Sequence, residues 1–192
     1  MSLIRGTWKF ASKLGYQVSQ LEFPQLKIAK PSVRFLSDVE EDNLLVRLNP
    51  RREGPGLAPL HERSESIQQM LQDSYDLAVI LLDTGGRYSE IANIEWKRID
   101  MEARTINLWR TKVSNGLILH MTDRVYQILQ RRQGNGVHVF QNKAGGARGY
   151  STHSIRKAIK KAGLDGCRVH SFRHTLATRP VSYTHLTLPT NR

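Results

Sequence analysis

Apolar residues along this chain fall into short segments with helical or alternating spacing, separated by polar turns. The longest uninterrupted apolar run, Leu77–Leu82, is far shorter than the roughly 20 residues that a membrane span needs. It lies within SYDLAVILLDTG, which is apolar nearly all round and therefore predicts a buried helix. We expect Asp73 to cap that helix at its start, and Gly85 and Gly86 to end it.

Capping residues and helical spacing predict further helices on both sides of the buried one. Ser37 marks the clearest start, because acids crowd into the first turn after it, where the helix dipole favours them. Asp123 is the expected cap of a later helix, and Ser151 or Thr152 that of another. The predicted helices cover residues 4–14, 37–48, 64–72, 74–85, 87–96, 123–132 and 151–162, with a last one beginning near residue 170.

Residues 104–122 have the alternation of an antiparallel hairpin. The run RTINLW places Ile106 and Leu108 on one face, an Asn-Gly pair at 115–116 is a turn signal, and LILHMT returns. GVHVFQ at 136–141 is one more short β-like run. The pattern therefore predicts the α+β class, mainly helical with a small antiparallel β-sheet.

Composition narrows the possible functions. A length of 192 residues predicts roughly one domain, and a hydrophobic content of 39% can form a core. The single cysteine, Cys167, excludes an internal disulfide and a cysteine-rich zinc site, and it favours a reducing, cytoplasmic compartment. The seven histidines are scattered, and neither an HExxH motif nor a phosphate-binding glycine fingerprint is present. We therefore expect no metal and no cofactor. The N-terminus MSLIRGTWKF lacks the apolar block of a signal peptide.

The net charge of +12 is concentrated in one third of the chain. Residues 1–123 hold 16 basic and 16 acidic side chains, whereas residues 124–179 hold twelve basic side chains and one acid, Asp165. A solvated basic face is one explanation, and a membrane-surface helix is disfavoured because no apolar face accompanies the charge. Nucleic acid is the favoured partner, because each neutralised phosphate releases counterions. The predicted DNA-contacting residues are Lys143, Arg148, Lys157, Lys160 and Lys161.

Three segments carry polar groups that simple structural roles do not require. DTGGRYSEI sets Arg87 after a glycine pair, with Glu90 three residues on, although an ordinary helix restart with a surface arginine would look the same. RTKVSNG puts Lys112 at a hairpin tip, where lysines are usually solubilising. VHSFRHT places His170 and Arg173 on one helix face, joined by His174, and this face can bind an oxyanion. A capping histidine beside a structural arginine is the alternative.

Taken together, these segments resemble the catalytic domain of tyrosine-type site-specific recombinases, the phage integrase family. LLDTGGRYSEIANIEWKRID is similar to the first arginine box, the hairpin at 104–122 to the β2–β3 hairpin, and VHSFRHTLATR to the second box with its HxxR motif. FLSDVEEDNLL resembles the entry into the catalytic domain, so the resemblance covers residues 34–179.

The resemblance implies metal-independent cleavage of double-stranded DNA through a 3′-phosphotyrosine intermediate. It assigns Arg87 and Arg173 to a clamp that neutralises the transition state, and Lys112 to protonation of the leaving 5′-oxygen. His170 would relay the proton of the nucleophile or bond the phosphate, and Glu90 would orient its neighbours. Family members act as tetramers on two duplexes, and the resemblance places the protein in a bacterial or phage-derived, nucleoid-associated setting.

The end regions depart from the family pattern. Beyond Arg179 the sequence RPVSYTHLTLPTNR contains no Gly-His or Gly-Trp box, and Tyr183 lies only ten residues after Arg173, too close to be the family nucleophile. We expect 1–33 to be the remnant of a core-binding domain with its linker, 34–179 to be an incomplete catalytic domain, and 180–192 to be a non-native tail. The expected function is DNA binding without cleavage and without tetramer assembly.

Two alternatives remain open at this point. The chain could be a non-catalytic DNA- or RNA-binding module that uses only the basic segment 124–179, or a ribosome-associated basic protein. The ribosome-associated alternative leaves the ordered arginine boxes unexplained.

Overall fold

A computed structural model of the chain describes residues 2–18, 33–110, 115–134 and 136–179. The chain divides into two units, residues 1–32 and 33–192, and each is described by itself. The first contains helix α1, Ser2–Lys13. Within the described ranges, no helix is both long and apolar enough to cross a membrane.

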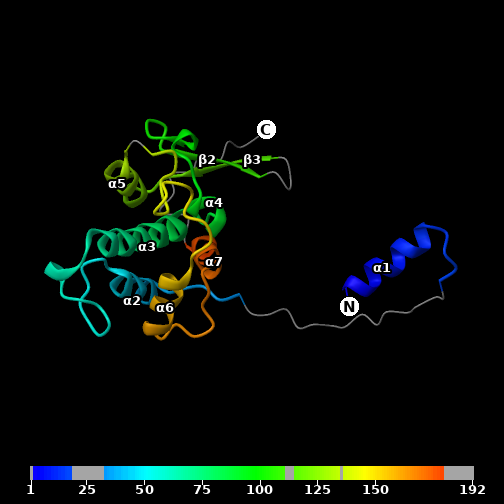
Figure 1. Ribbon diagram of the computed structural model, residues 1–192, viewed down its shortest axis with the longest axis horizontal. Helices are drawn as coiled ribbons and strands as arrows, with labels where there is room; N and C mark the ends of the chain where they lie inside the picture. Colours follow the sequence, from blue (N-terminus) through cyan, green and yellow to red (C-terminus); the bar gives the residue numbers. More distant parts are fainter. Residues whose placement is uncertain (1, 19–32, 111–114, 135, 180–192) are drawn as a thin grey trace. The chain divides into compact units, whose positions relative to one another are not determined.

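The second unit contains the remaining elements (Figure 1). They are α2 (Asp38–Leu48), the 3-10 helix η1 (Leu60–Glu62), α3 (Glu65–Thr84), α4 (Tyr88–Ala92), the 3-10 helix η2 (Trp96–Arg98), β1 (Ile99–Asp100), β2 (Thr105–Arg110), β3 (Asn115–His120), α5 (Asp123–Arg132), α6 (His153–Lys161) and α7 (Ser171–Thr178).

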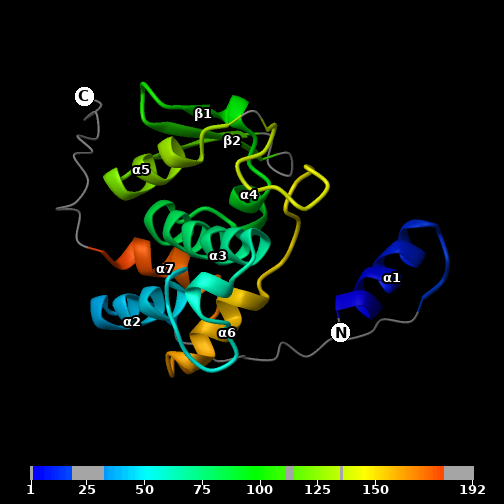
Figure 2. The ribbon, with the colours of Figure 1, turned by 60° about the vertical axis from the view of Figure 1, so that its left-hand side comes forward.

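Helix α3 runs through the middle of this unit. Helix α5 and the sheet lie on one side of it, and α2, α6 and α7 lie on the other (Figures 1 and 2). Its second half is buried nearly all round, as the apolar run Leu77–Leu82 predicted. Phe140 and Phe172 are buried in the same core. Helix α3 contacts α2, α4, α5, α6 and α7, so it connects segments that are far apart in the sequence. Helices α4 and α7 both pack against its C-terminal end.

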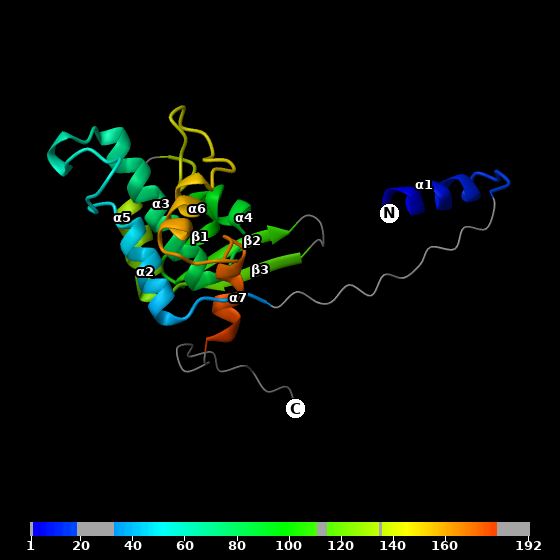
Figure 3. The ribbon, with the colours of Figure 1, turned by 90° about the horizontal axis from the view of Figure 1, so that it is seen from below.

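The sheet has three antiparallel strands in the order β1-β2-β3. Strand β2 pairs with β3 from Thr105↔His120 to Arg110↔Asn115, so Ile106 and Leu108 share the buried face, as the alternation predicted. The hairpin extends away from the helices (Figure 3). The α+β class, mainly helical with a small antiparallel sheet, is confirmed.

The predicted break at Asp73 is wrong, because α3 is one continuous helix from Glu65 to Thr84, capped by Ser64. Asp73 does not cap a helix because its carboxylate is buried and accepts from two arginines, Arg132 and Arg148. A carboxylate that is bonded to residues elsewhere in the fold is no longer available to accept a hydrogen bond from a neighbouring backbone N–H and so to start a helix. Helix propensity alone could not show those partners.

Smaller corrections concern turns and caps. Asn115 and Gly116 belong to β3, paired with Arg110 and Trp109, and therefore do not form the predicted turn. Thr122, rather than Asp123, caps α5 by accepting from the backbone N–H of Val125. Residues 136–141 form isolated bridges, such as Glu95↔His138, and no regular strand. The prediction of Ser37 as a cap is confirmed, and Glu40 completes a capping box there.

Candidate functional site

A glycine pair shapes the C-terminal end of α3. Gly85 adopts a left-handed conformation with φ of 60°, and its N–H donates to the carbonyl of Leu81. A Cβ on Gly85 would lie 2.9 Å from the Cδ2 atom of Leu176 in α7, and one on Gly86 would lie 2.6 Å from the Cγ1 atom of Ile91 in α4. The missing side chains therefore let α4 and α7 pack closely against the same end of α3.

Arg87 follows the glycine pair directly and occupies the N-cap position of α4. The carboxylate of Glu90 accepts from the Arg87 backbone N–H at 3.0 Å and lies 3.4 Å from its Nη1 atom. The Glu90 side chain is 15% exposed, whereas that of Arg87 is 55% exposed. Glu90 thus restrains Arg87 through these contacts. The exposed part of the Arg87 side chain remains accessible to an anion.

Arg173 reaches the same place from the other arginine box. Its Nη1 atom donates to the carbonyl oxygen of Gly85 at 2.8 Å, although the two residues are 88 positions apart. Gly85 lies two positions before Arg87, so this bond brings the two predicted clamp residues to one end of α3. The carbonyl satisfies one guanidinium donor, and other donors of the fork stay available for a second acceptor.

His170 and His174 lie on the same side of α7 as Arg173. His170 is exposed at the start of the helix, and its ring meets that of His174 edge to face, with ring centroids 5.0 Å apart. Lys112 lies outside the described residues, as does Tyr183. Four predicted residues, namely Arg87, Glu90, His170 and Arg173, therefore belong to α4 and α7 with their N-caps, and both helices pack against the buried C-terminal end of α3. Of these residues, Arg87 and His170 are exposed. Such a set can bind and polarise a phosphate oxyanion.

A glycine-rich loop packs against α4 and ties the first arginine box to the start of α6. The Tyr88 hydroxyl donates to the carbonyl of Ser151 at 2.6 Å, and Asn93 Oδ1 accepts from the Gly149 N–H at 2.9 Å. Tyr88 also meets Tyr150 edge to face. Lys143 is exposed in this loop. The predicted DNA-contacting loop is therefore connected to the helix that carries Arg87.

Buried carboxylates neutralise part of the basic segment, which sequence reasoning missed. Asp73 and Asp76 on α3 pair with Arg131, Arg132 and Arg148, while Glu41 on α2 and Asp83 on α3 pair with Arg124 and Arg179. Five of the twelve basic residues are thus committed internally, which leaves seven. Three acids within the apolar helix α3 were the available signal, because an isolated buried carboxylate is too costly.

Arg148, one of the predicted DNA-contacting residues, has partners inside the protein. Its side chain is 10% exposed, and its guanidinium faces Asp73 and Ser74 of α3. By contrast, Lys157, Lys160 and Lys161 are exposed on α6, and within the described ranges no acid pairs with them. Sequence counting could not separate these two groups, because both carry the same formal charge.

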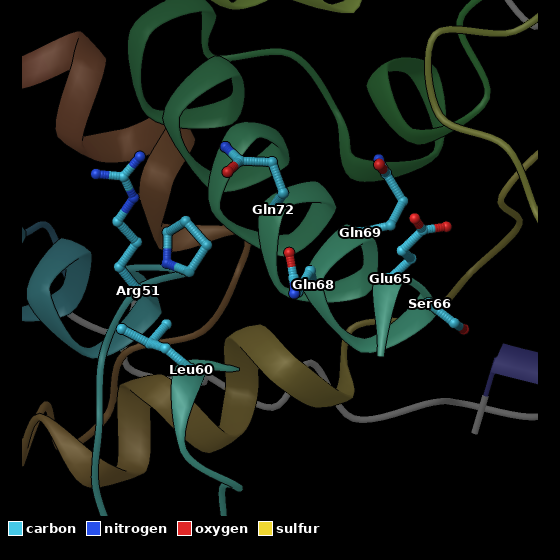
Figure 4. A pocket seen from close by; sticks show the side chains of 8 residues that line it. Arg51, Leu60, Glu65, Ser66, Gln68, Gln69 and Gln72 are labelled. Carbon is cyan, nitrogen blue, oxygen red and sulfur yellow. The ribbon is translucent and has the colours of Figure 1, made fainter. Parts of the chain in front are cut away.

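A groove of ≈ 900 Å³ lies elsewhere, along the first half of α3. Arg51 and Leu60 face Gln68 and Gln72 across it (Figure 4). None of the four clustered residues at the end of α3 lines this groove. It is therefore separate from the candidate phosphate site.

Comparisons with known proteins bear on the family and the fold of the chain. The family model described as "Phage integrase family" matches residues 60–181, which is more than half of the chain. The integrase of Salmonella phage P22 is 27% identical over 134 residues, covering 62% of this chain. The match covers only 35% of the length of that relative.

Solved structures share the fold. XerH site-specific recombinase, bound to its difH substrate, superimposes with a TM-score of 0.62 at 16% identity, covering 91% of this chain and 50% of XerH. The Tn1549 transposon integrase, in complex with a circular intermediate DNA, gives a TM-score of 0.57 at 20% identity, with coverages of 80% and 55%. The catalytic domain of bacteriophage HP1 integrase gives 0.51 at 17% identity, with coverages of 76% and 70%.

Proposed function

This chain belongs to the phage integrase family, and on that premise we propose that residues 34–179 bind duplex DNA and hold one phosphate between Arg87 and Arg173. The observation that carries this proposal is the bond from Arg173 to the carbonyl of Gly85, two positions before Arg87. This bond links two arginine boxes that are far apart in sequence, and the Arg87 side chain beside it is 55% exposed. Guanidinium groups suit a phosphate because their donors form a planar fork.

The chemistry proposed for this site is metal-independent phosphoryl transfer through a 3′-phosphotyrosine. Arg87 and Arg173 neutralise charge that develops on the non-bridging oxygens, and donors fixed in advance can contribute several kcal/mol each. His170, which is exposed at the start of α7, is proposed to bond the phosphate or to relay a proton. Glu90 restrains Arg87. Lys112 remains the proposed donor of a proton to the leaving oxygen.

A second surface supports DNA binding. The exposed lysines of α6, together with Lys143 in the loop attached to α4, contribute positive charge that no described acid neutralises. Relatives with this fold were solved with DNA, namely XerH with difH and the Tn1549 integrase with a circular intermediate. We propose that α6 contacts the backbone of the duplex while the two arginines engage a single phosphate.

Salt dependence of binding to a random-sequence duplex tests the clamp. Arg87→Ala and Arg173→Ala should each lower the slope of log K against log salt by about 0.9, the value for one lost phosphate contact. Arg104→Ala is the matched control. Arg104 is similarly exposed but pairs with Asp123 and does not belong to either arginine box. Unchanged slopes in both clamp variants would refute the proposal.

Covalent capture on a nicked suicide duplex tests separately whether Tyr183 serves as the nucleophile. We expect no covalent product that depends on Tyr183, because Tyr183 lies too close to Arg173 in sequence to be the family nucleophile. Robust product from the wild-type chain that disappears in Tyr183→Phe would assign the nucleophile to Tyr183 and overturn this expectation.

The exposed α6 lysines favour a second candidate, a non-catalytic nucleic-acid-binding module. Under that function, binding would be indifferent to Arg87→Ala and Arg173→Ala and would be lost when Lys157, Lys160 and Lys161 are replaced. The same salt titrations therefore distinguish the two functions.

A further inference from the structure

Arg179, directly after the end of α7, joins that helix to two others. Its Nη2 atom pairs with Oε2 of Glu41 on α2, and its Nη1 atom lies 3.4 Å from Oδ1 of Asp83 on α3. Both carboxylate residues are only 6% exposed. One guanidinium fork therefore spans two buried carboxylates that belong to different helices.

The same two carboxylates have a second cationic partner. Arg124 of α5 places its Nε atom 3.1 Å from Asp83 Oδ2 and its Nη2 atom 3.0 Å from Glu41 Oε1. The Thr122 hydroxyl also donates to Asp83 Oδ2, at 2.6 Å. Hydrogen bonding to Asp83 raises the pKa of Arg124 above its ordinary value. Arg124 and Thr122 would therefore still neutralise or bond these carboxylates if Arg179 were removed. The bridge made by Arg179 also affects the position of α7.

Side chains at both ends of α7 contact the last turn of α3. Asp83 lies two positions before Gly85, whose carbonyl accepts from Arg173. Helix α7 is therefore attached to the last turn of α3 at two points, by Arg173 near its start and by Arg179 just after its end. The two residues are six positions apart, or about 9 Å along a helix at 1.5 Å per residue. Phe172 packs α7 against the core and Leu176 packs it against Gly85, and the polar contacts at its two ends restrain its direction further.

We propose that Arg179 is a positioning residue, whose bridge to Glu41 and Asp83 fixes α7 against α3 and thereby holds the Arg173 guanidinium in the phosphate site. The inference rests on the proposed function, since it assigns a purpose to the placement of Arg173. Fixing a binding group in advance strengthens binding, because less conformational freedom is lost when the ligand arrives.

The chain supplies a matched control in Arg131. It pairs with Asp76, which keeps Arg132 as a second partner, just as Glu41 and Asp83 keep Arg124 when Arg179 is removed. Arg131→Ala therefore removes one positive charge from a buried carboxylate cluster without touching α7. Any difference between Arg179→Ala and Arg131→Ala reports on position rather than charge.

A double-mutant cycle on the 192-residue chain tests the coupling, with affinity for a random-sequence duplex as the readout. We expect Arg179→Ala to weaken binding by about threefold to tenfold, within the range of coupled neighbours. Arg131→Ala should have no such effect. The variant carrying both Arg173→Ala and Arg179→Ala should bind no more weakly than Arg173→Ala alone. Additive losses would overturn the inference.

Guanidinium NMR of isotopically labelled protein gives a readout that does not need DNA. The Arg173 signal, assigned by its absence in Arg173→Lys, should be protected from exchange in the wild type and in Arg131→Ala, and should lose protection in Arg179→Ala. Retained protection would overturn the inference. If Arg173→Ala leaves DNA affinity unchanged, the proposed function fails, whereas this NMR comparison still decides the positioning role.

Arg179→Lys covers the case in which Arg179→Ala fails to fold. The lysine keeps the positive charge but has a single ammonium group, which cannot span two carboxylates as a fork does. We expect it to fold and to reduce Arg173 protection. Full protection and wild-type affinity in Arg179→Lys would show that charge alone suffices, which contradicts the inference.

Discussion

Helices α5 and α6 are both short, basic and amphipathic, yet their basic side chains have opposite environments. Arg124, Arg131 and Arg132 of α5 face buried carboxylates on α2 and α3. The lysines of α6 are exposed, and no described acid pairs with them. Both helices come from the segment whose formal charge is +11. Helix α6 also packs against α2 and α3, which both carry acids, so what distinguishes the two helices is whether their basic side chains meet those acids.

Three of the four acids that pair with the arginines of α5 lie on α3, and the fourth, Glu41, lies on α2. Asp73, Asp76 and Asp83 of α3 are separated by three and seven residues, which places them on one side of a helix that is otherwise largely apolar. Each of them is buried and meets at least one arginine. The positive field available to a polyanion therefore comes from fewer residues than the sequence count indicates.

The largest effect that this comparison predicts is on folding stability. Arg132 is 9% exposed, pairs with Asp73 and Asp76, and covers the Phe140 ring at 4.4 Å. Arg132→Ala leaves two buried carboxylates short of a partner, so we expect a loss of about 3–5 kcal/mol in the free energy of unfolding. Urea denaturation measures this loss.

Lys157→Ala is the counterpart on α6. Because Lys157 is exposed and unpaired among the described residues, we expect the free energy of unfolding to change by less than about 0.5 kcal/mol. Similar losses for Arg132→Ala and Lys157→Ala would erase the distinction between the two helices.

An effect of intermediate size is expected on DNA binding. Replacing Lys157, Lys160 and Lys161 together by Ala should lower the slope of log K against log salt by about 2.7, or 0.9 for each phosphate contact. Arg148→Ala should leave that slope unchanged, because its guanidinium already faces Asp73. Fluorescence anisotropy across a salt series measures both variants. A reduced slope in Arg148→Ala would mean that the internal pair opens towards DNA.

Much of the fold followed from local signals. The Ser37 cap and the alternation of Ile106 and Leu108 each depend on neighbours in sequence, and the structure confirms both. Asp73 and Asn115 were misinterpreted for the opposite reason. Their roles are set by Arg132 on α5 and by the strand register, which local preference does not contain. Tertiary partners override weak local preferences.

The candidate site shows the same division. Arg87 and Arg173 could be selected from sequence motifs, and in the structure Arg173 bonds the carbonyl of Gly85, two positions before Arg87. The bridge from Arg179 to Glu41 and Asp83 could not be predicted from a sequence motif, because these residues lie 138 and 96 positions before Arg179. Motifs identify the groups that contact a ligand, whereas the groups that hold those residues in place depend on packing.

The smallest effect comes from a basic residue that is paired but only half-buried. Arg34 binds Glu40 at 2.5 Å, and this contact, followed by the Ser37 backbone N–H, lowers the pKa of Glu40 from 4.5 to about 2. Because the folded-state pKa is below the unfolded one, the pair stabilises the fold fully above about pH 4.5, and its contribution is lost as pH falls towards 2.

Arg34→Ala should therefore raise the pKa of Glu40 towards 4.5 without reaching it, because the Ser37 N–H remains bonded to the carboxylate at 3.0 Å. Carboxyl NMR titration measures the shift, and the free energy of unfolding near neutral pH should fall by much less than in Arg132→Ala, since solvent screens a partly exposed pair. An unchanged pKa would mean that the Ser37 cap alone holds the carboxylate. A loss of stability as large as that of Arg132→Ala would show that exposure does not separate strong pairs from weak ones.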